Sequence, residues 1–471
     1  MDLNADYRML INGALVGAEA HIDVINPATG EAFAHAPDCS EDQLNDAVAA
    51  ARAAFPAWRD TPVDERAKLL VACADAIAPH AEDMGRLFTR EQGRPVHFAI
   101  GEISGACDIM KAVAQMRLPD EIVEDSDTQY VEKTHKPLGV VCAIAPWNFP
   151  VNLALVKICP ALLMGNTVVL KPSPYTPLCT LKIAELLSTI LPAGVLNVIT
   201  GGDALGPMMT AHPGFDKISF TGSTATGKKV MASAAVDLKR MTLELGGNDA
   251  AIILPDVDLD EVAEKIFFGA FFNTAQICIA TKRMYVHEDI YDALRDRLAA
   301  IAAHAKVGDG TEQGTMLGPI QNKPQYDRVM NLLEDAKSKD LTLIQGADIP
   351  DNAGYFVPVT IVDNPPEDER VVQEEAFGPI LPMLKFKDID DVIDRANDSE
   401  YGLAGAVWTK DTESAKQIAR RMETGTVWIN QNLTLRPDTP FAGHKQSGFG
   451  AEYGLEGLAE YTVPQVVMMA K

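Results

Sequence analysis

The sequence lacks the features that mark a secreted or a membrane-spanning protein. No apolar run approaches the ~20 residues that a helix needs to cross a bilayer, and the first residues lack the basic start and apolar core of a signal peptide. The seven cysteines are widely scattered, with no CxxC pair and no Cys/His cluster at zinc spacing. We therefore expect free thiols, a reducing cytoplasmic setting and no metal site.

Basic charge is also scarce. The chain carries 41 Lys and Arg against 66 Asp and Glu, which gives a net charge of −25. Nucleic-acid backbones and anionic membrane surfaces both attract basic proteins, so we expect neither as a partner. What the chain does contain, 47% hydrophobic and 23% charged residues, is typical of globular proteins, and 471 residues are too many for a single core.

Short apolar strands alternate with longer helices along most of the chain. A capping box at Ser40–Gln43 predicts one helix, and Thr61-Pro62 predicts the start of another. Apolar strands are expected at 140–145, 167–170, 195–199, 217–220, 241–245, 250–254 and 284–286, and further helices at 176–190, from 226, at 259–272 and at 290–303. This alternation is typical of parallel sheets, so we predict an α/β protein with two open parallel-sheet (Rossmann-like) domains that join near Gly246-Gly247.

Two stretches depart from this pattern. Residues 126–136 are polar and alternate in character, which predicts an exposed antiparallel strand. Residues 461–469 form a β-rich tail, which we expect to pair with that strand or with another subunit. Together they predict a small antiparallel β element beside the two domains.

A glycine-rich segment, Gly222-Ser-Thr-Ala-Thr-Gly227, follows an expected strand and opens a helix. Glycines let a backbone approach a phosphate, and a helix N-terminus offers free N–H groups. The spacing nearly matches the nucleoside-triphosphate loop, and Lys228 fits that loop, but Lys229 stands where a Ser or Thr would bind magnesium. On this segment alone an NTP-dependent enzyme, a structural turn and a dinucleotide site all stay open.

Taken together with Glu244 and Cys278, this loop resembles the aldehyde dehydrogenase superfamily. A lone cysteine is more often a small buried hydrophobe than a nucleophile, so the resemblance depends on the whole set. Further matching blocks follow in the family's order, at Pro146–Pro150, Lys171–Ser173, Glu375–Pro379, Asn397–Leu403, Gly425–Asn430 and Pro440–Gly448. The similarity covers nearly the whole chain and implies a hydrolytic, NAD(P)-dependent enzyme that oxidises an aldehyde to a carboxylic acid.

The resemblance also implies a division of the chain into domains. The cofactor-binding domain would comprise residues 1–118 and 139–245, and the catalytic domain residues 246–445. A bridging or oligomerisation element would comprise residues 119–138 and 446–471. Because the family assembles as dimers or tetramers, we expect a homodimer or a homotetramer.

Three residues would carry the chemistry. Cys278, as a thiolate, would add to the aldehyde to form a thiohemiacetal, whose oxyanion the Asn148 amide and the Cys278 backbone N–H would stabilise. After hydride transfer to a nicotinamide, a thioester would remain, and Glu244 would take a proton from the water that hydrolyses it. A CoA-acylating enzyme needs no such base, so Glu244 favours release of the free acid.

The resemblance further implies a set of cofactor-binding residues, namely Ile144, Trp147, Lys171, Ser173, Gly222, Ser223, Gly227, Leu245, Glu375 and Phe377. NAD is the expected cofactor. Relatives that prefer NAD often carry Glu at the position of Pro174, where it binds the ribose 2′-hydroxyl and repels a 2′-phosphate. Because proline does neither, NADP stays possible. Ala275 stands where the family often has glycine. Alanine allows fewer backbone conformations than glycine does.

The passage to the thiol would be lined by apolar side chains, namely Phe149, Val156, Phe272, Ile277, Ile279 and Phe441. Relatives that bind succinic semialdehyde often carry Arg at the position of Phe272. Without that Arg a distal carboxylate would enter an apolar passage unpaired, at a cost in desolvation. We therefore expect a hydrophobic aldehyde, aromatic or of medium chain length, unless Arg436 reaches the mouth of the passage.

Two other functions stay open besides an NTP-dependent enzyme. A cysteine hydrolase would use Cys278 and Glu244 without redox chemistry, but it would not need the blocks around Lys171, Ser223 and Glu375. A catalytically silent binding or structural protein would not need the intact Cys, Glu and Asn set. The expected partner is accordingly a small-molecule aldehyde.

Overall fold

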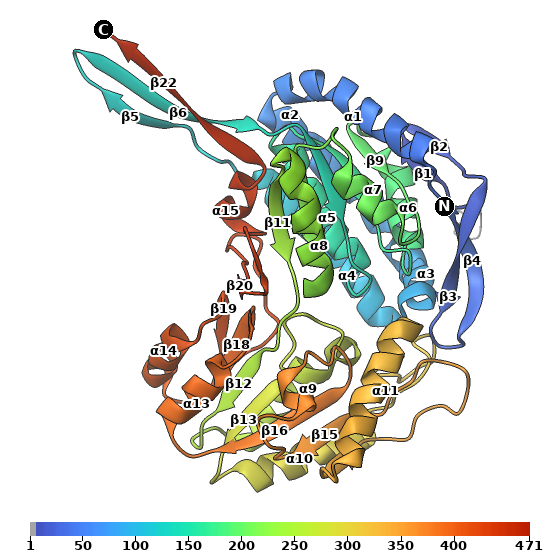
Figure 1. Cartoon of the computed structure of the whole chain (residues 1–471), viewed down its shortest axis with the longest axis vertical. Coiled ribbons are helices and arrows are strands. Elements are labelled where there is room, and N and C mark those ends of the chain that lie inside the picture. Colours follow the sequence, from blue (N-terminus) through green and yellow to red (C-terminus); the bar gives the residue numbers. More distant parts are fainter. Residues whose placement is uncertain (1–5) are drawn as a thin grey trace.

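The computed structural model describes residues 6–471 and shows two lobes, with a thin arm that projects from the upper one (Figure 1). The first five residues lie outside the described residues. Part of the signal-peptide expectation and the predicted start of the cofactor-binding domain fall on them. Among the residues that are described, no helix is long and apolar enough to cross a membrane.

The upper lobe is built on an eight-stranded sheet in the order β2-β1-β9-β8-β7-β10-β11-β21. Its strands are β1 (Met9–Ile11), β2 (Ala14–Val16), β7 (Val140–Ile144), β8 (Thr167–Lys171), β9 (Leu196–Val198), β10 (Lys217–Thr221), β11 (Arg240–Glu244) and β21 (Gly448–Phe449). The five central strands run parallel, whereas β1, β2 and β21 pair antiparallel at the two edges.

Helices cover both faces of this sheet because successive strand residues point to opposite sides. The helices are α1 (Glu41–Asp60), α2 (Val63–Ile77), α3 (Ala81–Gln92), α4 (Val96–Gln115), α5 (Pro150–Leu163), α6 (Leu178–Leu187), α7 (Leu205–Ala211) and α8 (Thr224–Ala234), with short 3-10 turns at Ala78–His80 and Ala235–Asp237. Val140 and Cys142 pack with α1, α7 and α8, whereas Val141 and Ala143 pack with α2, α4, α5 and α6. Strands buried on both faces read as continuous apolar runs, which explains why the sequence identified them.

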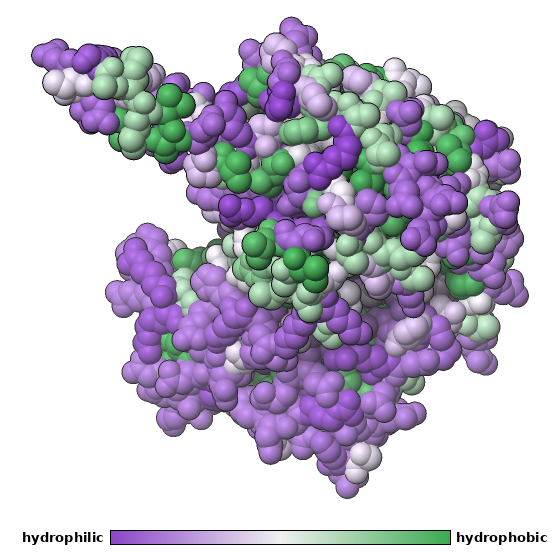
Figure 2. All heavy atoms as spheres, turned by 45° about the horizontal axis from the view of Figure 1, so that its top comes forward, coloured by the Kyte–Doolittle hydropathy of each residue, from purple (hydrophilic) through white to green (hydrophobic). Residues whose placement is uncertain are grey.

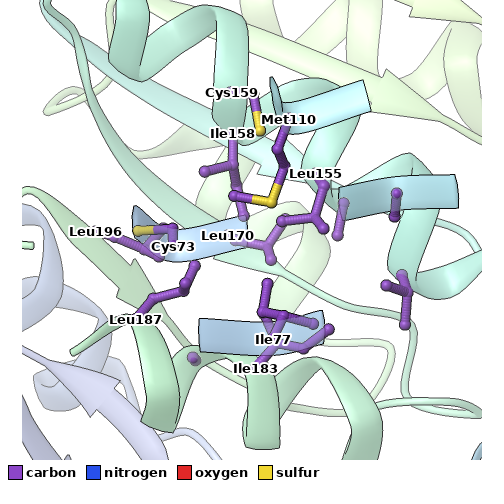
Figure 3. Packing of buried hydrophobic residues seen from close by; sticks show 14 of the residues in the cluster. Cys73, Ile77, Met110, Leu155, Ile158, Cys159, Leu170, Ile183, Leu187 and Leu196 are labelled. Atoms are coloured by element: carbon purple, nitrogen blue, oxygen red, sulfur yellow. The ribbon is translucent and has the colours of Figure 1, made fainter. Parts of the chain in front are cut away.

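Figure 3 shows part of the layer formed by α2, α4, α5 and α6. The side chains of Ile77, Met110, Leu155 and Ile183 gather around Leu170 of β8. Each such side chain contributes about 1.5–3 kcal/mol when it is fully removed from water. This packing fixes the strands whose ends carry the site.

The lower lobe contains a seven-stranded sheet in the order β14-β15-β16-β13-β12-β18-β19. Its strands are β12 (Ala250–Ile253), β13 (Arg283–His287), β14 (Leu343–Gln345), β15 (Thr360–Asp363), β16 (Ile380–Phe386), β18 (Ala404–Trp408) and β19 (Thr426–Ile429). One face is covered by α9 (Leu259–Phe271) and α10 (Tyr291–His304), and the other by α11 (Lys323–Ser338), α13 (Ile389–Asn397) and α14 (Thr412–Arg421). All pairings are parallel except that of β14, so the prediction of two parallel-sheet domains is confirmed.

Smaller elements complete the two lobes. They are the hairpin β3 (Ala20–Asn26) and β4 (Glu31–Asp38), the turn Phe272–Ala275, α12 (Arg370–Gln373), the pair β17 (Tyr401–Gly402) and β20 (His444–Lys445), and α15 (Gly454–Ala459). The domain boundaries at 118, 139, 245 and 445 stay predictions. Within the stretch 446–471, β21 adds to the upper sheet and α15 packs on α5, so this stretch contributes to the lobe as well as to the arm.

The arm is a three-stranded antiparallel sheet in the order β22-β6-β5. Its strands are β5 (Glu121–Asp125), β6 (Gln129–Pro137) and β22 (Thr462–Ala470). The register places Thr462 opposite Pro137 and Ala470 opposite Gln129. The expected pairing of the C-terminal tail with the polar strand is therefore confirmed, whereas β5 was not expected from the sequence.

Several helix boundaries differ from the expectation. The capping box is confirmed, because Ser40 Oγ accepts from the Gln43 N–H at 3.2 Å and Gln43 Oε1 accepts from the Ser40 N–H at 3.1 Å. Pro62, however, is the N-cap of α2 and not its first helical residue. The helix expected to reach residue 190 ends at Leu187, and the one expected from residue 226 begins at Thr224. Such ends are set by local hydrogen bonds that apolar periodicity does not reveal.

Candidate active site

A hollow of about 270 Å³ opens between the lobes, at the carboxyl ends of β7, β10 and β11. Strands β7 and β10 flank the point where the strand order reverses, which is where open parallel sheets usually bind ligands. The hollow is lined by Pro146, Trp147, Asn148, Leu153, Thr221, Gly222, Ser223, Thr224, Ala225, Leu245, Gly246, Cys278, Gln325, Arg328, Glu375, Phe377 and Tyr401. The structure thus brings Asn148 and Cys278 together with six of the ten predicted cofactor residues.

Cys278 lies on the loop between α9 and β13 and is partly exposed at the wall of this hollow. Burial raises the pKa of its thiol to about 12, although the nearby Lys282 ammonium acts in the opposite direction. Lys282 Nζ also donates to the carbonyl oxygen of Cys278 at 2.6 Å. Burial thus favours the neutral thiol, and the expected attack by a thiolate stays a prediction.

Three consecutive left-handed residues lead into the Cys278 loop. Asn273, Thr274 and Ala275 have φ angles of 51°, 56° and 59°. This conformation costs a residue with a side chain of the order of 1 kcal/mol or more, so neighbouring contacts have to hold it. Thr274 Oγ1 provides one such contact, because it donates to the Gly318 carbonyl at 2.9 Å. Ala275, which stands where relatives often have glycine, occupies a position that favours glycine.

Asn148 follows β7 and is only 4% exposed. Its side-chain Nδ2 donates to the carbonyl oxygen of Gln276 at 3.0 Å. Gln276 precedes Cys278 by two residues, so the Asn148 amide lies beside the main chain that carries the thiol. An amide held in this place is suited to donate to an oxygen that develops negative charge next to the sulfur.

Glu244 is the last residue of β11 and is 3% exposed. Neither of its carboxylate oxygens has a hydrogen-bond partner among the described residues. Burial raises its pKa well above the usual range, the Glu452 carboxylate raises it further, and Lys157 acts in the opposite direction. Glu244 does not line the hollow, whereas the next residue, Leu245, does.

Lys157 and Glu452 form a buried ion pair near Glu244 that the sequence analysis missed. Lys157 Nζ lies 2.5 Å from a Glu452 carboxylate oxygen and donates to Thr221 Oγ1 at 2.7 Å. Lys157 is the single charged residue in the apolar helix α5. That contrast was a usable signal, because a buried lysine needs a partner.

The residues that line the hollow fit a dinucleotide. The first turn of α8 offers free N–H groups, and Ser223, its N-cap, is exposed there. The Glu375 carboxylate accepts from the Gly247 N–H at 3.1 Å and offers further acceptor sites for hydroxyl groups. Trp147 and Phe377, which meet edge to face at 5.4 Å, provide apolar surfaces for rings. These groups could hold phosphate, ribose and ring, respectively.

Four predicted cofactor residues do not line the hollow. Ile144 and Lys171 stand opposite each other near the ends of β7 and β8, and Ser173 follows Lys171. Burial lowers the pKa of Lys171 to about 8, while Asp203 and Asp38 act in the opposite direction. Gly227 lies inside α8, where an added Cβ would meet Leu245 Cδ2 at 2.5 Å, so its role is to let this helix approach Leu245 closely. For all four residues the cofactor role stays a prediction.

The predicted passage residues belong to one apolar cluster of the lower lobe. Val156, Ile277, Ile279 and Phe441 are buried in it, and Phe149 and Phe272 pack against it, as does Cys278. Phe272 also lines a separate hollow of about 630 Å³ on the outer side, shared with Phe98, Lys265, Phe268, Gly269, Trp408, Asn430, Gln431, Asn432 and Leu433. Phe272 is thus the predicted passage residue that lies at this outer hollow.

Arg436 stands on the surface. Its side chain is 67% exposed and pairs with the Asp438 carboxylate at 2.6 Å. It lines neither the hollow that holds Cys278 nor the one beside Phe272.

Two residues of the hollow carried no recognisable sequence signal, namely Gln325 and Arg328, whereas Tyr401 belongs to the matching block Asn397–Leu403. Gln325 Nε2 donates to the carbonyl of Phe377 at 3.1 Å, and Arg328 donates to the carbonyl of Glu375 at 3.1 Å. They hold the loop that carries Glu375 and Phe377.

Lys228 and Lys229 are exposed and do not line the hollow, which speaks against a nucleoside-triphosphate loop. Within residues 6–471, no group of three or more His, Cys, Asp or Glu side chains is placed to hold a metal ion.

Known proteins share this architecture over the full length of the chain. The family model described as the aldehyde dehydrogenase family matches residues 15–467. An aldehyde dehydrogenase from a Fusarium species is 40% identical over 99% of each chain. A phenylacetaldehyde dehydrogenase from Pseudomonas fluorescens is 38% identical over 99% of this chain and 97% of its own.

Solved structures agree with these relatives. The NAD+ complex of an aldehyde dehydrogenase from Bacillus cereus superimposes with a TM-score of 0.97 at 37% identity, covering 99% of this chain and 97% of its own. An NADP-dependent enzyme from E. coli superimposes with a TM-score of 0.95 at 35% identity, covering 99% and 98%.

The burial of Glu244 makes a prediction about stability. Replacing Glu244 with Gln should raise the melting temperature relative to the native protein, and more so at about pH 9 than at about pH 6. A carboxyl whose folded pKa is raised loses its stabilisation as the pH rises through that pKa, whereas Gln does not titrate. Calorimetry measures this, with the exposed Glu334→Gln as control. A Glu244→Gln protein that is less stable than native at the higher pH would contradict it.

Proposed function

Because the chain belongs to the aldehyde dehydrogenase family and is an NAD(P)-dependent enzyme that oxidises aldehydes to acids, we propose that the hollow holding Cys278 is its active site. The observation that carries the proposal is that Cys278 and Asn148 share this hollow with Ser223 and Glu375. A nucleophile and an oxyanion donor thus stand beside groups suited to a dinucleotide.

Cys278 is the nucleophile of this proposal. The thiol first gives its proton to water, a step that burial makes more costly, and the thiolate sulfur then adds to the carbonyl carbon to give the thiohemiacetal oxyanion. The oxygen of the adduct gains negative charge. Asn148 Nδ2 and the Cys278 backbone N–H are the two donors for that oxygen, and losing one such donor typically costs ~10²–10³ in rate.

The residues of the hollow would hold the dinucleotide. Glu375 would bind ribose hydroxyls, the start of α8 with Ser223 would bind phosphate, and Trp147, Leu245 and Phe377 would line the space for the rings. When bound, the nicotinamide supplies a hydride acceptor for the carbon attached to Cys278.

Glu244 is the proposed base for the second half of the reaction. Its carboxylate takes a proton from water, which then attacks the thioester carbonyl and releases the acid from Cys278. Burial raises the pKa of this carboxyl, so it holds an accepted proton more tightly than an exposed glutamate does. The nearby Lys157–Glu452 ion pair places one positive and one negative charge close to the Glu244 carboxyl.

We propose a hydrophobic aldehyde, aromatic or of medium chain length, as the substrate. The predicted passage residues belong to or pack against one apolar cluster that Cys278 also contacts, and the outer hollow beside Phe272 offers three further aromatic side chains, Phe98, Phe268 and Trp408. The relative from Pseudomonas fluorescens that acts on phenylacetaldehyde supports an aromatic substrate.

NAD is the proposed cofactor, with NADP as a second possibility. The relative from Bacillus cereus binds NAD+, whereas the E. coli enzyme is NADP-dependent. Pro174 lies three residues after Lys171 and is half-exposed, and it offers neither a hydrogen-bond acceptor side chain nor a charge. The Pro174 side chain therefore neither binds a ribose 2′-hydroxyl nor repels a 2′-phosphate.

A homodimer or homotetramer is proposed on the strength of the arm. Figure 2 shows apolar residues on the arm where it stands clear of the body. Ile122, Val123, Met468 and Met469 are each more than half exposed there. Apolar side chains gathered on a projecting sheet are suited to a second copy of the chain.

A cytoplasmic location fits the seven free thiols, and cell fractionation tests it.

The nucleophile is tested by substitution. Cys278→Ala should lower the rate of NAD(P)H formation by at least about 10³-fold, because Cys278 is the one cysteine among the residues that line the hollow. Cys107→Ala, which removes a buried thiol distant from the hollow, serves as the matched control and should keep the native rate. Absorbance at 340 nm reports the product. A Cys278→Ala protein with native turnover would remove the assignment.

The substrate class is tested with a panel of aldehydes. We expect a higher kcat/KM for phenylacetaldehyde, benzaldehyde and hexanal than for succinic semialdehyde, because a distal carboxylate would be desolvated without a partner. Phe272→Arg should move kcat/KM for succinic semialdehyde upward by about tenfold or more. Preference of the native enzyme for succinic semialdehyde would show that the apolar assignment is wrong.

The cofactor choice is tested on the same panel. Native enzyme should reduce both NAD+ and NADP+, with higher kcat/KM for NAD+. Pro174→Glu should lower kcat/KM for NADP+ by about tenfold or more, because the new carboxylate repels the 2′-phosphate. The kcat/KM for NAD+ should stay within about threefold of the native value. An equal loss with both cofactors would mean that residue 174 does not face the 2′ position.

Assembly is tested by light scattering coupled to gel filtration. The native chain should elute as a dimer or a tetramer, and Met468→Asp should shift it toward smaller species, because burying an unpaired carboxylate is costly. Lys416→Asp, on the exposed face of α14, is the control. A native monomer at micromolar concentration would contradict the proposal.

A further inference from the structure

Arg94 is a buried arginine between α3 and α4 that the reaction scheme does not use. It is 3% exposed, yet each of its three guanidinium nitrogens has a partner. Nη1 pairs with a Glu102 carboxylate oxygen at 2.5 Å, Nε donates to Gln92 Oε1 at 3.0 Å, and Nη2 donates to the carbonyl oxygen of Asn148. A buried charge is tolerated only with such partners, so this residue is held in one place.

On one side, Arg94 fixes the loop that carries Asn148. The second oxygen of Glu102 accepts from the backbone N–H groups of Val151 and Asn152, at 3.1 and 3.0 Å. These belong to the first turn of α5, which starts two residues after Asn148. The Arg94–Glu102 pair therefore holds both the helix N-terminus and the carbonyl just before it.

On the other side, the contacts of Arg94 reach the loop that carries Cys278. Gln92, which accepts from Arg94, donates through Nε2 to Asn273 Oδ1 at 3.3 Å. Asn273 Nδ2 in turn donates to the carbonyls of Asn148 and Gln276, each at 3.3 Å. Since Asn148 Nδ2 also donates to Gln276, the five residues Arg94, Asn148, Gln276, Asn273 and Gln92 form a closed circuit of hydrogen bonds.

We propose that Arg94 is a positioning residue that sets the Asn148 amide relative to the Cys278 backbone N–H, and thereby the two donors that receive the substrate oxygen. Arg94 lines neither hollow and touches no reacting atom. It acts through the main chain of Asn148 and through the left-handed turn at Asn273. The inference rests on the proposed function of these two donors.

A purely structural role is the alternative, and the chain contains a matched example. Arg66 is also buried, and its Nε and Nη1 donate to the carbonyls of Leu163 and Arg59 at 2.8 and 3.2 Å. Those carbonyls lie away from the hollow. Arg66→Lys therefore reports what loss of a buried guanidinium does to stability without a change at the site.

A kinetic double-mutant cycle tests the proposal. Arg94→Lys keeps the charge beside Glu102 but cannot reach Glu102, Gln92 and the Asn148 carbonyl at once. With the full chain and saturating cofactor, it should lower kcat by about tenfold or more, with the ~10²–10³ that an oxyanion donor contributes as the upper limit. In an Asn148→Ala background the same change should lower kcat by less than about twofold, because the donor it positions is already gone. An equal loss in both backgrounds would overturn the proposal.

Two further measurements separate positioning from damage to the site. The rate of Cys278 alkylation by iodoacetamide needs no oxyanion donor, so in Arg94→Lys it should stay within about twofold of native. Arg66→Lys should lower the melting temperature by about as much as Arg94→Lys does, and its kcat should equal that of the native enzyme. An alkylation rate that falls as far as kcat would mean that Arg94 supports the thiol itself, and the proposal would be wrong.

The circuit can be opened a second way if Arg94→Lys does not fold. Gln92→Met keeps the volume and leaves the Arg94–Glu102 pair intact, and it should show the same dependence on Asn148 with a smaller loss of kcat. A Gln92→Met effect that is independent of Asn148 would overturn the proposal. Native enzyme that reduces no NAD(P)+ with any aldehyde would instead refute the proposed function.

Discussion

The chain passes from the upper sheet to the lower one within a few residues, and the arrangement of the site depends on that crossing. Glu244 ends β11 and Ala250 begins β12. The crossing is possible because Gly246 and Gly247 carry no side chain: a Cβ on Gly247 would meet the carbonyl oxygen of Cys278 at 2.8 Å, and one on Gly246 would meet a Glu375 oxygen at 2.4 Å. These close approaches put groups from both lobes into one hollow.

The same crossing removes water from titratable groups. Glu244, Cys278 and Glu375 all have raised pKa values with burial as the leading cause. Their protons are therefore held more tightly than in water, and small changes of charge nearby shift them. In the proposed reaction Cys278 loses a proton and Glu244 accepts one, and both groups lie in this environment. That pairing is what an acylating and then hydrolysing site requires.

The parallel sheets and two of the three strands of the arm, β6 and β22, could be predicted from the sequence because their signals are local. Continuous apolar strands such as 140–144 and a loop like Gly222–Gly227 are each read within ten residues or so. The Lys157–Glu452 pair joins residues 295 apart in the chain, and the Gln92–Asn273 bond joins residues 181 apart. No pattern in a short stretch of sequence predicts pairs between residues so far apart in the chain. The raised pKa of the Cys278 thiol escaped sequence reasoning for a related reason, since distant segments bury this side chain.

The central claim is that an acyl group passes through Cys278 and leaves with the help of Glu244. Mass spectrometry of the Glu244→Gln enzyme after a single turnover with hexanal and NAD+ tests it most directly. The account predicts a hexanoyl adduct on the peptide that contains Cys278, which persists because thioester hydrolysis has lost its base. An unmodified Cys278 peptide with full release of hexanoic acid at the native rate would contradict it.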